Sequence, residues 1–273
     1  MCSMILSFVI TSFNREVLIL RTIDSILNQS TSSSLYEIII IDDLSSDNTV
    51  KVLLNNYENE IDTGLIKVIL NKENIGVTGS KNRGYEESAG DWVIFIDSDD
   101  LLVPDILPNM LCEFNDAPNS PIIFFRCCDE EKKFVGVKFD NKKILGIKEY
   151  VENTSFGEAL TCINKNIVSE LPYVSELRGY EGLGCSRIIL RYGPSILSTV
   201  VARTYDTSGD DRLSSFVAFR KRSFLLCSGH FMYLKEFSTF MSYSLKFKYI
   251  LKIIFYFSFG LYNKLIAKLK KEG

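Results

Sequence analysis

Residues 92–101 read WVIFIDSDDL and combine an apolar run with a tight group of acids. The first five residues are apolar and partly β-branched, which favours a buried strand. Three of the next four are Asp97, Asp99 and Asp100. Carboxylates a few ångströms apart repel one another, so such a group calls for a cation or for protonation. The stretch therefore predicts a buried strand that ends at a ligand-binding edge.

The residues before this stretch alternate between strand-like and helix-like patterns. Short apolar runs without polar alternation predict strands that are buried on both faces, and runs with one apolar face predict helices. The predicted strands cover 4–11, 37–41, 65–70 and 92–96, and the predicted helices cover 17–27, 50–57 and 80–88. Such alternation is typical of an α/β fold with a Rossmann-like, mostly parallel central sheet flanked by helices.

The pattern is less regular after residue 106. We expect a helix at 107–114, strands at 122–127 and 134–139, and helical stretches within 168–190 that Pro172 and three glycines interrupt.

Polar clusters follow three of the predicted strands. They are TSFNR at 11–15, the pair Asp42-Asp43, and the acids at 97–100. Because ligands bind outside the carboxyl ends of parallel strands, all three clusters are expected on one rim.

These residue types suit a nucleotide and a metal. Asp97 and Asp99 can share a hard cation such as Mn²⁺ or Mg²⁺, which also bridges to phosphates. Phe13 offers a stacking surface, and Asp43 can accept a hydrogen bond from a base N–H. Arg15 or Lys81 can meet a phosphate. Each residue has a structural alternative: Asp42, Asp43 and Asp47 as helix caps, Asn48 as a cap beside Asp47, Phe13 in the core, and Lys81 as a solvated charge.

Composition narrows the function further. The 273 residues carry a net charge of −3, which argues against nucleic acid as a partner. The only histidine is His230, so a general base is expected to be a carboxylate. Seven scattered cysteines without a C-x-x-C pair indicate a reducing compartment. The N-terminus lacks a signal-peptide pattern, so we expect a cytoplasmic protein.

The tail, residues 245–273, holds seven lysines and one glutamate. Its uncharged stretch, 253–263, is shorter than the roughly 20 residues that a spanning helix needs. Lysines around an aromatic-rich segment favour an interfacial helix, peripheral on an anionic membrane. The alternative is a helix packed on the body or on a second subunit.

The motifs TSFNR, IIIIDDLSSDNT and NIGVTGSKNRGYEESAGDWVIFIDSDD, spread over roughly residues 4–115, resemble the family 2 glycosyltransferases with the GT-A fold. The resemblance implies a UDP-sugar donor, a divalent metal and inversion at the anomeric carbon. It assigns Thr11, Phe13 and Asp43 to the uridine, Asp97 to the ribose, sugar and metal, and Asp99 to the metal. Asp100 is an additional acid that orients the donor sugar or the metal waters. Lys81 stands where the family usually has arginine, which puts a bidentate phosphate contact in question.

An inverting displacement needs a base for the acceptor hydroxyl. The family usually carries Glu-Asp in its second half, whereas this chain has Glu181 followed by Gly182. Glu181 is therefore our candidate base, with Glu176 as the second candidate and a helix-capping role for Glu181 as the alternative. Arg203 and Arg212 flank a polar loop. Arg212 is expected to close over the diphosphate, unless Asp206, Asp210 and Asp211 pair with these arginines as loop structure.

Together these features predict three parts: residues 1–115 for the nucleotide-sugar, 116–240 for the acceptor and catalysis, and 241–273 as a helical, membrane-associating tail. The expected reaction transfers a hexose or N-acetylhexosamine from a UDP-sugar to a saccharide on a lipid diphosphate at the inner membrane surface, in surface-polysaccharide (O-antigen) assembly. The alternatives are a nucleotidyltransferase and a non-catalytic nucleotide-sugar-binding scaffold.

Overall fold

The computed structural model describes residues 5–152, 157–205 and 222–272, with side chains up to residue 266. The strands are β1 (Leu6–Ser12), β2 (Tyr36–Asp42), β3 (Ile66–Leu70), β4 (Trp92–Asp97), β5 (Leu101–Leu102), β6 (Ile122–Cys128), β7 (Phe134–Val135), β8 (Lys143–Leu145), β9 (Ala159–Asn164) and β10 (Ser195–Thr204). The helices are α1 (Leu18–Leu27), α2 (Thr49–Asn56), α3 (Glu58–Asp62), α4 (Gly76–Glu87), α5 (Leu107–Asp116), α6 (Ile147–Glu152), α7 (Glu181–Tyr192), α9 (Ser223–Phe237) and α10 (Tyr243–Glu272). Two 3₁₀ turns, at Ser33–Leu35 and Ser238–Phe240, complete the described elements.

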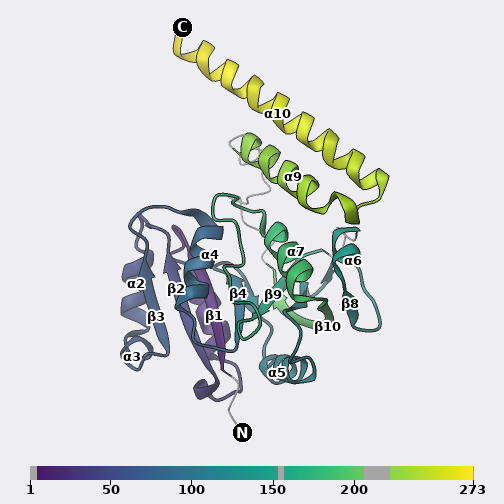
Figure 1. Cartoon of the computed structure of the whole chain (residues 1–273). Helices are drawn as coiled ribbons and strands as arrows, with labels where there is room; N and C mark the ends of the chain where they lie inside the picture. The colour runs from purple at the N-terminus through teal and green to yellow at the C-terminus, as the bar shows by residue number, and fades with distance from the viewer. Residues whose placement is uncertain (1–4, 153–156, 206–221, 273) are drawn as a thin grey trace.

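One sheet runs through the body of the molecule in the order β3-β2-β1-β4-β9-β6-β10-β5, with β7 beside β6 and β8 beside β10 (Figure 1). The four predicted N-terminal strands are parallel, as expected. The sequence patterns did not reveal β9 and β10. Strand β9 lies antiparallel between β4 and β6, and it joins the two halves of the chain into a single mixed sheet. The strand expected at 134–139 is only Phe134–Val135.

Helices cover both faces of this sheet because neighbouring strand residues point to opposite sides. Phe8 and Ile10 pack with residues of α1 and α5. Val9, between them, packs on the other face with residues of α4 and α7. The strands are therefore apolar on both sides, which confirms the predicted three-layer arrangement.

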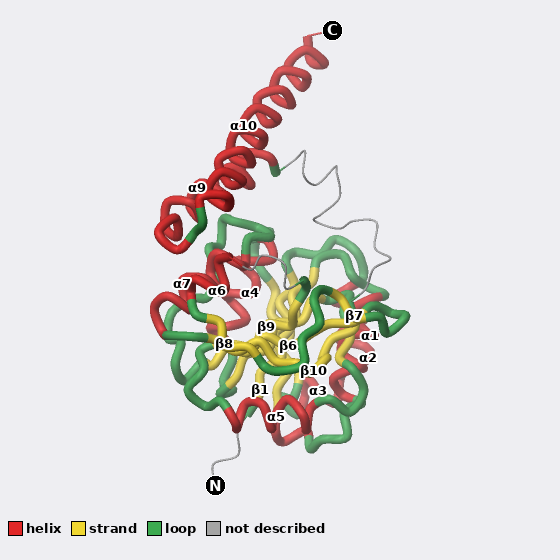
Figure 2. Tube along the Cα trace, turned by 90° about the vertical axis from the view of Figure 1, so that its right-hand side faces the viewer, coloured by secondary structure: helices red, strands yellow, loops and turns green. Residues whose placement is uncertain are grey.

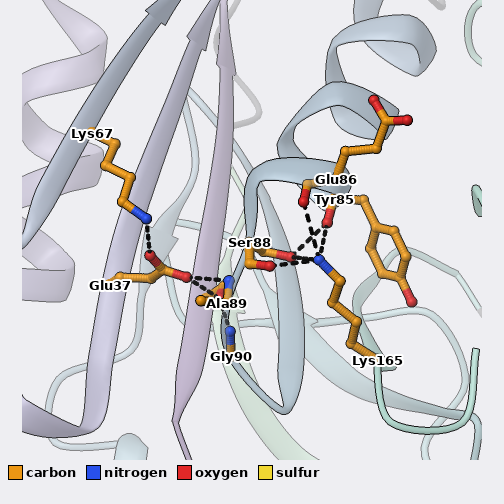
Figure 3. Close-up of polar contacts among 9 residues, drawn as sticks. Glu37, Lys67, Tyr85, Glu86, Ser88, Ala89, Gly90 and Lys165 are labelled. Atoms are coloured by element: carbon orange, nitrogen blue, oxygen red, sulfur yellow. Dashed lines mark hydrogen bonds and ion pairs between the residues drawn. The ribbon is translucent and has the colours of Figure 1, made fainter. Parts of the chain in front are cut away.

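Helix α4 is held at both ends by residues distant in sequence. It begins at Gly76, four residues before the predicted start, where a φ of +79° suits glycine. At its other end, Lys165 donates from Nζ to the carbonyl oxygen of Tyr85 at 2.6 Å and to Ser88 Oγ at 3.0 Å (Figure 3). A cation at a helix C-terminus satisfies carbonyls that have no partner within the helix. Figure 3 also shows Glu37 joining Lys67 to the turn before β4.

Helices α9 and α10 form a separate layer beyond the body (Figures 1 and 2). Tyr233 and Phe237 of α9 and Leu245 and Tyr249 of α10 make a small core with Leu183 of α7. In Figure 1, β1 begins at the end of the body that is away from this pair, so the carboxyl end of β1 faces α9 and α10. No helix within the described ranges is both long and apolar enough to cross a bilayer.

Candidate active site

The predicted convergence of polar clusters on one rim is confirmed by the strand register. Thr11 of β1 lies beside Asp97 of β4, and Ser12 lies beside Asp42 of β2. The main chains of these strands therefore bring all three clusters to the same edge of the sheet.

Two loops at this edge are tied together by hydrogen bonds. The backbone N–H of Asn14, which has a φ of +54°, donates to Ser45 Oγ at 2.9 Å, and Asn14 Oδ1 accepts from the N–H of Ser46 at 2.8 Å. The N–H of Arg15 donates to Thr49 Oγ1 at 2.8 Å. Phe13, in the loop held by these hydrogen bonds, is 47% exposed. Its ring is therefore available for stacking and is not buried in the core.

Asp43 is a buried anchor for the start of α4. Its Oδ1 accepts from Asn71 Nδ2 and from the N–H of Ile75, and its Oδ2 accepts from the N–H of Gly76, each at 2.8 Å. A carboxylate has about four acceptor positions, so three donors leave room for one more, such as a base N–H. Asp43 therefore does accept hydrogen bonds from the start of a helix, as the capping alternative proposed, but this helix is α4 and not α2, the next helix along the chain. At α2, Asp47 rather than Asn48 provides the side-chain cap, accepting from the N–H of Thr49 at 3.0 Å.

Lys81 links the first half of the chain to the second. Its buried ammonium lies 3.0 Å from Asp97 Oδ1 and 3.5 Å from Glu181 Oε1. Burial alone would lower the pKa of Lys81, but the charges of Asp97 and Glu181 outweigh it and raise that pKa. Lys81 is therefore a fixed cation between two carboxylates, rather than a solvated helix charge.

The pKa of Asp97 depends on burial and on three nearby cations. Burial would raise its pKa, but the cations Lys81, Arg203 and Arg15 outweigh burial and lower it. Its side chain is 41% exposed, so a charged carboxylate is open to a ligand at this edge.

Arg203, which the sequence analysis placed beside a polar loop, is part of this site. It lies in β10 and is 4% exposed. Its guanidinium is 2.9 Å from Asp100 Oδ2, 3.9 Å from Asp97 Oδ2 and 3.4 Å from Glu158 Oε2. Burial would lower the pKa of Arg203, but Cys127, Asp100 and Asp97 outweigh burial and raise it. The sequence signal that could have placed Arg203 in a buried strand is its position within the largely apolar segment SILSTVVART, residues 195–204.

Asp100 is 1% exposed, and its carboxylate forms the ion pair with Arg203. Asp100 therefore lies deeper in the protein than Asp97, whose side chain is partly exposed. Asp99 is partly exposed at the same edge. Lys81 and Arg203 together contact four carboxylates, Asp97, Asp100, Glu158 and Glu181. Arg15 also acts on Asp97, and Arg222 interacts with Glu181, so the acids of this cluster exceed its cations only when Asp99 is counted.

That excess and the open edge fit a divalent cation that takes one or two carboxylates and completes its shell with substrate phosphates and water. They do not fit a cage made by the protein alone. Among the described residues, no group of three or more His, Cys, Asp or Glu side chains is placed to hold a metal.

The two candidate bases differ in position. Glu181 opens α7 at the rim and its side chain is 29% exposed, whereas Glu176 is exposed in the preceding segment. Gly182 follows Glu181 on the exposed side of the same turn. Arg212, Asp206, Asp210 and Asp211 lie outside the described residues.

Comparison with known sequences adds to this geometry. The model of glycosyl transferase family 2 matches residues 7–165. A GalNAc(5)-diNAcBac-PP-undecaprenol beta-1,3-glucosyltransferase from Campylobacter jejuni is 30% identical over 182 residues, which are 64% of this chain and 57% of the relative. A poly(ribitol-phosphate) beta-N-acetylglucosaminyltransferase, TarP, from Staphylococcus aureus is 38% identical over 120 residues, 43% of this chain. The chain thus spans little more than half of the first relative and 35% of the second.

Solved structures share the fold at low identity. TarS 1-349 of S. aureus in complex with UDP-GlcNAc aligns with a TM-score of 0.62 at 14% identity, over 92% of this chain and 72% of that one. The mannosyltransferase PcManGT from Pyrobaculum calidifontis, in complex with GDP-Man and Mn²⁺, aligns with a TM-score of 0.67 at 14% identity, over 97% and 75%. These likenesses confirm the expected GT-A fold. Because the family model covers more than half of the sequence, including all three clusters on the rim, the chain belongs to glycosyl transferase family 2.

Proposed function

We propose that this chain is an inverting glycosyltransferase that moves a hexose or N-acetylhexosamine from a UDP-sugar to a saccharide carried on a lipid diphosphate. The observation that carries the proposal is the position of Lys81 between Asp97 and Glu181. This contact brings the predicted donor-binding edge within reach of a carboxylate from the second half of the chain.

The reaction follows from these positions. Glu181 accepts the proton of the acceptor hydroxyl while that oxygen forms a bond to the anomeric carbon of the donor sugar. The bond between the anomeric carbon and the diphosphate oxygen breaks, and its electron pair leaves with UDP. Attack opposite the leaving group inverts the anomeric configuration. Lys81 holds Glu181 and Asp97 in place through charge-assisted contacts, so base and donor keep a fixed separation.

A divalent metal would be held by Asp99, with Asp97 beside it and the donor diphosphate completing the site. When bound, such an ion neutralises the charge that develops on the diphosphate. Thr11, Phe13 and Asp43 are proposed to bind the uracil and Arg15 to meet a phosphate, because they surround the same edge. Asp100 is proposed to act through Arg203, by holding the guanidinium that faces Asp97.

Two observations support an acceptor at a membrane. The Campylobacter relative is named for transfer to a saccharide on undecaprenyl diphosphate. Helix α10 also exposes large apolar side chains beside its lysines, among them Phe247, Ile254 and Phe255. We therefore place the enzyme on the inner face of the cytoplasmic membrane, in the assembly of a surface polysaccharide such as O-antigen. Membership of the family argues against the nucleotidyltransferase alternative.

Transfer is tested with radiolabelled UDP-glucose, UDP-galactose and their N-acetyl forms, each with Mn²⁺ and a lipid-diphosphate-linked N-acetylglucosamine acceptor. We expect a product with one donor, and NMR of its linkage to show inversion. If no donor gives transfer or UDP release while UDP binds, the non-catalytic scaffold is correct and the proposal is wrong.

Glu181→Gln tests the base. We expect kcat to fall by roughly 10²- to 10⁴-fold with UDP affinity retained, because the amide cannot accept the proton. Glu176→Gln is the matched control and is expected to keep kcat within about twofold. The reverse ranking would make Glu176 the base.

A further inference from the structure

A cavity of about 440 Å³ lies between the candidate base and the C-terminal helices. Its lining includes Glu181 and Gly182 of α7, Tyr233 of α9, and Tyr249 and Lys252 of α10. The volume falls within the roughly 300–1,000 Å³ typical of small-ligand sites. The cavity therefore connects the proposed reaction centre to the helix that we place at the membrane.

Aromatic rings form much of its wall. Tyr180 lies 5.3 Å from His230 and 6.3 Å from Tyr233, and Tyr233 stacks on Tyr249 at 5.2 Å, measured between ring centroids. Tyr150 and Phe124 also line the cavity and stack on each other at 5.5 Å. Tyr150 and Tyr180 are partly buried, and both line the cavity. Flat apolar faces with hydroxyl edges match a pyranose ring, which has apolar C–H faces and hydroxyl groups around its rim.

The position after the base is open because it is a glycine. A Cβ atom added to Gly182 would meet only the Tyr150 hydroxyl, at 3.9 Å, within 4 Å. Gly182 lies in helical backbone, so the glycine is not required by a positive φ. Its effect is to leave space beside Glu181, at the position where a sugar hydroxyl must approach the base.

Charge is unequal along the cavity. Glu181 and Glu158 line it and can accept hydrogen bonds from hydroxyl groups, and each already lies beside a cation, Lys81 for Glu181 and Arg203 for Glu158. The exposed Lys252, on α10, is the one lysine or arginine among the described residues that line the cavity, so it is the position there that attracts an anion. A ligand with a neutral polar part and an anionic part would therefore enter with the neutral part toward Glu181 and the anionic part toward α10.

We propose that this cavity binds the acceptor, with its terminal sugar between Tyr150 and Tyr180 and its diphosphate at Lys252; the assignment of acceptor rests on the proposed function. The lipid then extends along α10. The open space at Gly182 sets which sugar fits, so the acceptor's specificity is decided on α7, α9 and α10 rather than at the donor edge.

The first experiment measures binding, so that it does not depend on turnover. N-acetylglucosamine carried on a short-chain prenyl diphosphate is titrated into the full chain, with UDP and Mn²⁺ present, by calorimetry. Gly182→Leu, which fills the space beside Glu181, is expected to weaken binding by about tenfold or more, equivalent to about 1.4 kcal/mol. Gly182→Ala is expected to have a smaller effect. Leu190→Phe adds bulk at an exposed position of the same helix that does not line the cavity, and is the control.

The second experiment tests the orientation of the ligand. Lys252→Glu is expected to weaken binding of the prenyl diphosphate ligand by about tenfold, because it replaces an attractive charge with a repulsive one. The same variant should bind the sugar on an uncharged octyl group as wild type does. Lys248→Glu makes the same charge change on α10 at an exposed residue outside the cavity, and is expected to leave both affinities unchanged.

The outcomes separate the two proposals. Unchanged binding in Gly182→Leu, with the variant shown to be folded by its melting temperature, would overturn the cavity assignment even if the enzyme transfers sugar. Equal effects of Lys252→Glu and Lys248→Glu would overturn the diphosphate position. If both variants weaken binding as expected but no donor supports transfer, the cavity assignment holds and the proposed transferase activity fails.

Discussion

At the scale of single residues, the ion pair of Arg203 and Asp100 is the least expected part of the site. Both side chains are almost fully buried and lie 2.9 Å apart. A buried charge without its partner is costly, whereas a buried pair replaced together often is not. Because of this pair, the position of residues 97–100, which carry the three acids, depends on β10.

This dependence predicts strong coupling between the two positions. Arg203→Met should lower the free energy of unfolding by about 3 kcal/mol or more, because it leaves Asp100 buried and charged. The double variant Arg203→Met with Asp100→Leu should be more stable than Arg203→Met alone. Urea unfolding of the wild type, of Arg203→Met, of Asp100→Leu and of the double variant measures the coupling. Additive losses would show that the pair is not an energetic unit.

The proposed role of Asp99 as a metal ligand can be tested at the same scale. Asp99→Ala should weaken the activation of sugar transfer by Mn²⁺ at least about tenfold, because one carboxylate of a site with few protein ligands is lost. Isothermal titration of Mn²⁺ in the presence of UDP should show the same loss. Unchanged activation would remove Asp99 from the metal site.

At the scale of elements, the position of α4 depends on residues far along the chain. Lys165→Met removes the donor that binds the carbonyls at the end of this helix. We expect a loss of about 1–2 kcal/mol in unfolding free energy, since hydrogen bonds to a charged donor are stronger than neutral ones. Lys72→Met, at an exposed lysine, should cost less than about 0.5 kcal/mol. Equal losses would contradict a capping role for Lys165.

Helices α9 and α10 enclose the single histidine of the chain, which is 7% exposed. Its Nδ1 lies 2.7 Å from the carbonyl oxygen of Leu226, so Nδ1 carries the donor proton. Burial, with a smaller effect of Lys252, lowers the pKa of His230 below its ordinary value of 6.5.

The unfolded chain therefore binds a proton at a higher pH than the folded one. The contribution of neutral, buried His230 to the free energy of unfolding is fully present above about pH 6.5. This contribution is lost as the pH falls from there toward the pKa of His230 in the folded protein. Melting temperatures at pH 7.5 and 5.5 should differ more for the wild type than for His230→Phe. An equal difference in both proteins would show that His230 does not contribute to acid sensitivity.

At the scale of the whole molecule, α10 places lysines and exposed apolar side chains on a helix that extends beyond the body (Figures 1 and 2). An anionic surface attracts such lysines by about 1 kcal/mol each. Reversing Lys246, Lys248 and Lys264 to Glu should therefore weaken binding to phosphatidylglycerol vesicles by about 100-fold or more. Sedimentation with the vesicles measures this loss.

A variant with equal net charge gives the control. Reversal of Lys51, Lys72 and Lys148, which are exposed on the body, should leave vesicle binding nearly unchanged. Equal loss in both variants would indicate an effect of net charge alone, and no binding by the wild type would contradict the interfacial helix.

The sequence by itself determined the α/β class, the first four strands and the edge on which their polar ends meet. These features depend on local hydrophobic pattern and on the geometry of parallel strands, both of which can be read along the chain. The resemblance to family 2 glycosyltransferases, rather than local pattern, pointed to Glu181 as the candidate base, and this role stays a prediction.

Only the tertiary structure decided which charges face one another. Asp100 and Arg203 are about a hundred residues apart, and so are Lys81 and Glu181, so no local pattern links them. Strands β9 and β10 acquire their places through pairing with distant strands, because strand propensity depends on neighbours in the sheet. The cavity at Gly182 likewise exists only when α7, α9 and α10 pack together, since its walls come from segments that meet on folding.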